Sequence, residues 1–139
     1  MNADNLQKTD NAPEQEEIQK LKKLINSSQF LGRNAMFVEQ RTYTLVPGSQ
    51  GEWIESYQKH ALEIQTEILG RLIGYFTTEF GALNQVVHMW AYDSFEERAK
   101  RRKQLFQDPR WLEFIPKVRP LIVSQESKIL IPTPFSPIR

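Results

Sequence analysis

The spacing of apolar residues along this chain alternates between two patterns. In some segments every second residue is apolar, which is typical of β-strands, and in others every third or fourth residue is, which is typical of α-helices. Strands are predicted at residues 36–46, 72–79, 84–92 and 121–131, and helices at 49–70 and 94–106, with a short helical segment from residue 108. The order β-α-β-β-α-β is that of the ferredoxin-like, or split βαβ, fold. The predicted class is therefore α+β, with an antiparallel-type sheet and both helices on one face.

Local signals support these boundaries. The pair Pro47-Gly48 fits the centre of a type II turn after the first strand. Capping boxes of the form S-x-x-E begin at Ser49 and Ser94, where the two long helices are predicted to start, and Gly70 is a plausible end of the first. The segment that follows residue 108 is expected to be broken by two prolines, Pro116 and Pro120.

Residues 1–34 are predicted to be a polar tail with a short amphipathic helix from Pro13 to about Ile25, and residues 35–139 to form the domain. The narrow apolar stripe of this helix is expected to dock on the domain or on a partner subunit. The sheet face without helices also needs a cover, because an apolar sheet face must be buried. A second copy of the same sheet is the economical cover, so a homodimer is predicted.

Composition excludes several classes of protein. A formal net charge of +1 argues against nucleic-acid binding, and the absence of cysteine removes disulfides and thiolate metal sites. No apolar run approaches the ~18 residues of a membrane span, and the acidic N-terminus lacks the apolar core of a secretory signal. A cytoplasmic location is therefore expected. The two histidines, His60 and His88, show no metal-binding spacing, and no cofactor fingerprint is present, so neither a metal nor a cofactor is expected.

Several segments resemble a known family. EQRTYTL at residues 39–45, followed by Pro47-Gly48, resembles the first strand of NIPSNAP proteins, and GYFTTEFG at 74–81 with LNQVVHMWAY at 83–92 resembles their central hairpin. Arg98, Arg102 and Trp111 fit the residues that follow, so the resemblance spans about residues 36–135. It implies a dimeric α+β barrel and supplies no reaction. The relatives of that fold include cofactor-independent monooxygenases.

Strand alternation predicts a polar and aromatic patch. Glu39, Arg41 and Tyr43 share one face of the first strand, and the third strand presents an imidazole and two aromatic rings on one face: His88, Trp90 and Tyr92. These strands are expected to be parallel neighbours, which would join the two sets. From the second helix, Arg98 and Arg102 lie four residues apart and are expected to overhang the patch.

Two functions fit this patch. In an enzyme acting on an aromatic or polyketide-like molecule, Tyr43, Trp90 and Tyr92 would stack the substrate, with Arg98 and Arg102 as further ligand-binding residues. Glu39 or His88 would then take a proton and Arg41 would stabilise the enolate, as in a cofactor-independent monooxygenase or isomerase. Alternatively, the charged residues form a paired buried network, His88 is a neutral structural residue, and the protein is a non-catalytic binding or adaptor protein.

Overall fold

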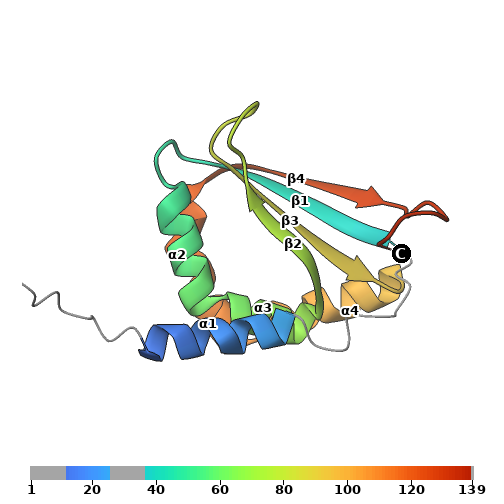
Figure 1. Ribbon diagram of the computed structural model, residues 1–139, viewed down its shortest axis with the longest axis horizontal. Helices are drawn as coiled ribbons and strands as arrows, with labels where there is room; N and C mark the ends of the chain where they lie inside the picture. Colours follow the sequence, from blue (N-terminus) through green and yellow to red (C-terminus); the bar gives the residue numbers. More distant parts are fainter. Residues whose placement is uncertain (1–11, 26–36, 139) are drawn as a thin grey trace, which may run out of the picture.

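The computed structural model describes residues 12–25 and 37–138, in which a four-stranded sheet packs against helices on one face (Figure 1). The sheet order is β2-β3-β1-β4, with bounds Arg71–Thr77, Gln85–Tyr92, Phe37–Leu45 and Ile122–Leu130. The helices are α1 (Ala12–Ile25), α2 (Gln50–His60), α3 (Leu62–Leu69), α4 (Phe95–Leu105) and α5 (Pro109–Val118), and a 3₁₀ turn, Arg119–Leu121, leads into β4. This arrangement confirms the predicted α+β, ferredoxin-like order.

Strands β1 and β3 are neighbours, but they run antiparallel, so the expectation of a parallel pair was wrong. The helical crossover makes β2 return parallel to β1, and the hairpin connection then inserts β3 between them in the opposite direction. Arg41 lies opposite His88, and Glu39 lies opposite Trp90. Directly opposed residues share a face of the sheet, so the two predicted sets of side chains do lie together.

The predicted helix at residues 49–70 is two helices with a bend at Ala61, whose φ of −125° is not helical. In α2 only one stripe is buried, through Trp53 and Tyr57. By contrast, α3 buries most of its surface, at residues 62, 64–66, 68 and 69. A straight helix could not bury both the single stripe of α2 and most of the surface of α3. The chain therefore turns, and α3 runs across the end of α2 (Figure 1).

The helix ends follow the predicted signals in part. The Ser94 Oγ accepts a hydrogen bond from the Glu97 backbone N–H, which is one half of a capping box, whereas the Glu97 carboxylate accepts from the Asp93 N–H. The Ser49 hydroxyl instead donates to the Val46 carbonyl, 2.6 Å away, so this second expected cap is not formed. This hydrogen bond from Ser49 reinforces the turn, in which Gly48 has the positive φ of 83° that a type II turn needs.

Pro116 lies inside α5 and does not break it, contrary to expectation. The missing N–H removes one hydrogen bond near the end of the helix, where few remain to be made. The apolar face of α5 holds the segment in place through Trp111, Phe114 and Val118, all of which are buried. The helix therefore continues to Val118, and the second proline expected to break it, Pro120, lies in the 3₁₀ turn that follows.

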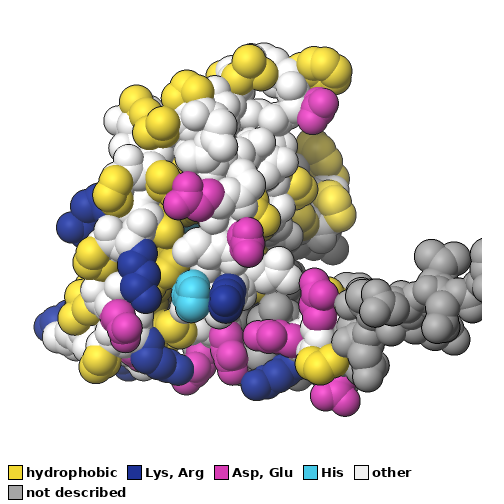
Figure 2. Space-filling view, turned by 90° about the vertical axis from the view of Figure 1, so that its left-hand side faces the viewer, with side chains coloured by type: hydrophobic (Ala, Val, Ile, Leu, Met, Phe, Trp, Pro, Cys, Tyr) yellow, Lys and Arg dark blue, Asp and Glu magenta, His cyan; other side chains and the backbone are white. Residues whose placement is uncertain are grey.

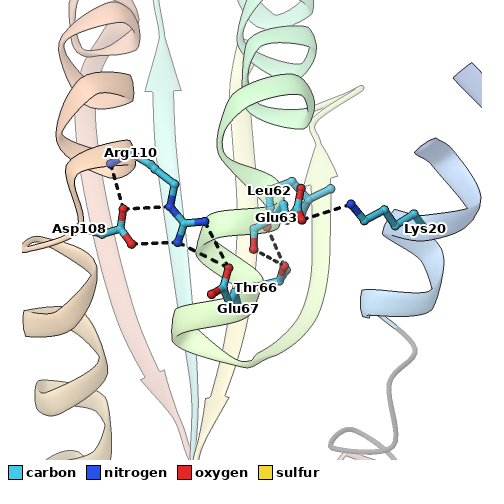
Figure 3. Close-up of polar contacts among 7 residues, drawn as sticks. All are labelled: Lys20, Leu62, Glu63, Thr66, Glu67, Asp108 and Arg110. Carbon is cyan, nitrogen blue, oxygen red and sulfur yellow. Dashed lines mark hydrogen bonds and ion pairs between the residues drawn. The ribbon is translucent and has the colours of Figure 1, made fainter. Parts of the chain in front are cut away.

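Ion pairs connect the helices at the surface (Figure 3). The Arg110 guanidinium, at the start of α5, contacts Asp108 and also Glu67 of α3, at N–O distances of 2.9 and 3.4 Å. Lys20 of α1 lies 3.5 Å from Glu63 of α3. The predicted N-terminal helix therefore exists and lies beside the domain, whereas the remainder of residues 1–34 lies outside the described residues. None of the described helices is long and apolar enough to cross a membrane.

Candidate functional site

A pocket of about 480 Å³ lies between the sheet and helices α2, α4 and α5. Aromatic rings from four different elements, β1, α2, β2 and α5, form much of its wall: Tyr43, Trp53, Tyr57, Tyr75, Trp111 and Phe114. Three arginines also line it, Arg41, Arg102 and Arg119, and among the described lining residues there is no Asp or Glu. A volume of this order suits a small organic ligand.

The aromatic rings of the pocket form one continuous contact set. The Tyr75 ring stacks on His88 at a centroid distance of 4.8 Å and contacts Tyr57 at 4.6 Å. The Tyr43 ring meets both His88 and Trp53 edge to face, at 4.9 and 5.7 Å. Burial raises the pKa of the Tyr57 and Tyr75 hydroxyls, so both remain protonated at neutral pH.

Glu39 is fully buried and is the centre of a paired network. Its Oε2 accepts hydrogen bonds from Arg98 at 2.6 Å and from Ser127 at 2.7 Å, and Arg41 Nη1 lies 3.4 Å away. Burial raises the pKa of the Glu39 carboxyl, but the hydrogen bonds from Arg98 and Ser127 and the two nearby charges outweigh it, so the pKa lies below its usual value. Glu39 is therefore an ionised acceptor, and it does not line the pocket.

His88 is 1% exposed, yet its ring forms part of the pocket wall. The Nδ1 atom accepts a hydrogen bond of 2.7 Å from the Trp90 indole N–H. Burial, opposed only in part by the charge of Glu39, lowers the pKa of His88 to about 3, and the positive charges of Arg41 and Arg102 act in the same direction. The imidazole is thus neutral at physiological pH.

The predicted site residues divide into two groups. Arg41, Tyr43, His88 and Arg102 line the pocket, where burial lowers the pKa of Arg102. The other four lie behind the wall or beside it, and none is among the lining residues: Glu39, Trp90, Tyr92 and Arg98. Trp90 and Tyr92 are fully buried, so their rings pack in the core and no face is left for stacking against a ligand.

Several wall residues were not predicted. Trp53, Tyr57, Trp111 and Phe114 follow helical spacing and read as core, which they also are. Tyr75 reaches the pocket because the register shifts between Leu72 and Gly74, which places both Leu72 and Tyr75 on the helix side of the sheet. The sequence offers one signal for these wall residues: Trp53 and Tyr57 lie four residues apart and so share one face of the helix α2.

Among the described residues, the charged groups that line this pocket are all arginines, and Gln65, Ser124 and Gln125 are its other polar side chains besides the tyrosines, His88 and the tryptophans. Arginine has no acceptor, and the Tyr43 and Tyr75 hydroxyl oxygens already accept from Arg41 and Trp53, each at 2.9 Å. Within residues 12–25 and 37–138, no cluster of three potential metal-binding side chains occurs. The arrangement favours a planar ligand with negative charge.

Comparison with known proteins agrees with this architecture. The family model described as NIPSNAP matches residues 38–137. A solved structure of a NIPSNAP family protein from Agrobacterium tumefaciens, described as having unknown function, is 45% identical, covers 77% of this chain and 96% of its own, and superposes with a TM-score of 0.74. An uncharacterized NIPSNAP-like domain protein from Burkholderia xenovorans is also 45% identical over 76% of this chain and 91% of its own, with a TM-score of 0.73.

Curated relatives include human NipSnap homolog 3A, 38% identical over 73% of this chain, and the Dictyostelium discoideum NipSnap homolog, 37% identical over 68%. The chain spans only 41% of the length of each. A putative antibiotic biosynthesis monooxygenase from Nitrosomonas europaea shares the fold alone, at 13% identity over 77% of this chain and 97% of its own, with a TM-score of 0.56. The order of elements, the strand residues 39–45 and 83–92 and these matches together place the chain in the NIPSNAP family.

Proposed function

We propose that this chain binds a planar, negatively charged small molecule in the pocket between the sheet and helices α2, α4 and α5. The observation that carries the proposal is the combination of aromatic walls with three arginines and no described carboxylate. Glu39 pairs with Arg41, but among the described residues no carboxylate forms an ion pair with Arg102, whose pKa is lowered by burial. A positive charge without such a partner in a partly enclosed site is costly. An anionic ligand would relieve that cost while its ring packs on the aromatic side chains.

Binding without turnover is the better supported of the two alternatives. Proton abstraction needs a base in contact with the ligand, but Glu39 lies outside the wall and is occupied by Arg98 and Ser127. His88 uses Nδ1 as the acceptor for Trp90. The likeness to a putative antibiotic biosynthesis monooxygenase concerns the fold alone, and one fold hosts many functions.

The proposal predicts selective binding of aromatic acids. Isothermal titration with 2-naphthoate and the neutral 2-naphthamide, which have nearly the same shape, should give at least about tenfold tighter binding of the acid, the effect of about one charge-assisted hydrogen bond. Arg102→Gln should remove most of this preference because it takes away one charge in the wall. The matched control is Arg110→Gln, since Arg110 is exposed and lies outside the pocket.

Equal affinity for acid and amide would contradict the proposal, as would an Arg102→Gln variant that keeps the full preference. A catalytic role would instead show itself as oxygen uptake, measured with an electrode, or as loss of the probe over time. Neither is expected with 2-naphthoate.

Two further expectations from the sequence belong to this proposal. We propose that the protein is a homodimer formed through the sheet face that carries no helices, and that it acts in the cytoplasm. Support for the dimer comes from that face, which we call the open face: Phe76 is 54% exposed, Leu130 is 40% exposed, and Val87 and Met89 between them are half-buried. The division at residue 35 likewise stays a prediction.

A further inference from the structure

We infer that the pocket recognises its ligand through two buried N–H donors, Nε2 of His88 and Nε1 of Trp111, so that the bound acid carries an acceptor oxygen in addition to its carboxylate. This inference rests on the proposed anionic ligand and specifies its chemistry further: a conjugated oxo acid, or an acid with an equivalent second oxygen. The donors come from different elements, β3 and α5, and both side chains line the pocket.

The hydrogen bond from Trp90 fixes which nitrogen of His88 carries the proton. An indole N–H can only donate, so Nδ1 of His88 must accept and carries no hydrogen. A neutral imidazole with a bare Nδ1 has its proton on Nε2. His88, a side chain of the pocket wall, is therefore a hydrogen-bond donor through Nε2, and the Nε2 lone pair that a general base would need is occupied by hydrogen.

Packing holds this donor in one orientation. Tyr75 covers one face of the His88 ring, nearly parallel at 11°, and Tyr43 meets the ring edge to face at 87°. The charged and titratable groups around it are Glu39, Arg41 and Tyr43 on β1, Tyr75 on β2 and Arg102 on α4. The arginines and burial together favour the neutral ring, in agreement with the tautomer that the Trp90 contact requires.

Both donors lack an acceptor among the described residues. Nε2 of His88 and Nε1 of Trp111 are buried and make no hydrogen bond there, and the two residues are only 1% and 6% exposed. A buried donor without a partner is costly, and both side chains line the pocket, so a ligand oxygen that reaches either nitrogen would relieve that cost. The neighbouring Tyr43 and Tyr75 oxygens are already used as acceptors by Arg41 and Trp53.

The tautomer can be measured on the free protein. Long-range ¹H–¹⁵N correlation spectra of protein with ¹⁵N-labelled histidine should show His88 as the Nε2–H tautomer without titration between about pH 5 and 8, since its pKa is lowered to about 3. His60 is the other histidine, and His60→Gln assigns the signals. An Nδ1–H tautomer, or a His88 signal that titrates near its ordinary pKa of ~6.5, overturns the inference whether or not any acid binds.

The ligand preference is tested with benzoylformate and phenylacetate, which differ in a carbonyl versus a methylene beside the carboxylate. Titration calorimetry should show about tenfold tighter binding of benzoylformate, the effect of about one hydrogen bond. The preference should survive in His88→Gln, whose amide places an N–H near the position of Nε2, and should fall in His88→Phe and Trp111→Phe. Thermal denaturation of each variant confirms that it is folded.

The outcomes separate the two proposals. Failure of wild-type protein to bind either acid contradicts the anionic pocket, whereas the tautomer spectra still decide the state of His88. Equal binding of both acids, or a preference that persists in both phenylalanine variants, leaves the anionic pocket in place and overturns the donor assignment.

Discussion

At the scale of single residues, the polar patch works by fixing protonation states. Glu39 is held ionised by Arg98 and Ser127, and His88 is held neutral by burial and by Trp90. A buried carboxylate among arginines, with its second oxygen Oε1 lacking a partner in the described structure, is a structural ion pair of the kind that is costly to break. These pairings determine which side chains remain available to a ligand.

The state of His88 predicts acid sensitivity of the fold. Its pKa is lowered to about 3 in the folded protein and is ~6.5 when unfolded, so the unfolded chain binds the extra proton. This contribution to stability is complete above about pH 6.5 and is lost as the pH falls toward 3, by about 1.4 kcal/mol per pH unit. Urea unfolding of wild-type protein and of His88→Gln, from pH 7.5 to 4.5, measures it.

His88→Gln should therefore show a smaller loss of unfolding free energy over that range, whereas the control His60→Gln should follow the wild type, because His60 lies on the exposed side of α2. Below about pH 4.5 protonation of Glu39, whose folded pKa is lowered, adds a second loss of the same sign. Parallel curves for wild type and His88→Gln would show that His88 is not buried as a neutral ring.

At the scale of elements, periodicity predicted most of the fold and about half of the site. Alternation correctly placed Arg41 and His88 on one face, since that depends only on local backbone geometry. It could not place Tyr75, because a bulge near Gly74 reverses the alternation, nor the bend at Ala61, because burial of α3 on most of its surface decides it. The order of the elements requires β1 and β3 to run antiparallel, and the expectation of a parallel pair applied that order incorrectly.

The helix ends offer a matched pair of glycines with opposite expected effects. Gly70 ends α3 with a φ of 92°, and an added Cβ would lie 3.0 Å from Arg101 Nη1. Gly70→Ala should destabilise the protein by about 1–2 kcal/mol. Gly51 lies in α2 with nothing within 4 Å of an added Cβ, so Gly51→Ala should stabilise by about 0.5 kcal/mol through helix propensity.

Chemical denaturation of the two variants under identical conditions measures both effects. Changes of the same sign and size would mean that the backbone at Gly70 relaxes at little cost, and the C-cap assignment would then fail.

At the scale of the whole molecule, apolar side chains remain uncovered in several places. One is the open face, and another is the end formed by the β2–β3 hairpin and the β1–α2 turn, where Phe80 is 89% exposed and Leu83 61%. Yellow side chains gather at the upper end of the view in Figure 2, whereas charged side chains gather at its lower end. Strand β4 is exposed along almost its whole length. Large exposed apolar patches are typical of interaction sites, so the exposed side chains of the open face support the proposed dimer.

The proposed dimer gives a direct prediction for the open face. Light scattering coupled to size-exclusion chromatography should return twice the chain mass of 16.3 kDa for the wild type. Met89→Glu should shift the protein toward monomer, because a charge would be buried at the centre of the interface. Leu112→Glu, on the exposed side of α5, should remain dimeric. A monomeric wild type, or a dimeric Met89→Glu variant, would remove this face as the interface.

The pocket wall also makes the protein its own optical reporter. The chain has three tryptophans: Trp53 and Trp111 line the pocket, and Trp90 lies behind it with its indole bonded to His88. Excitation of tryptophan therefore samples this one region and little else. A ligand that fills the pocket should quench or shift nearly all of the intrinsic emission, so candidate molecules can be screened in unlabelled protein at low concentration.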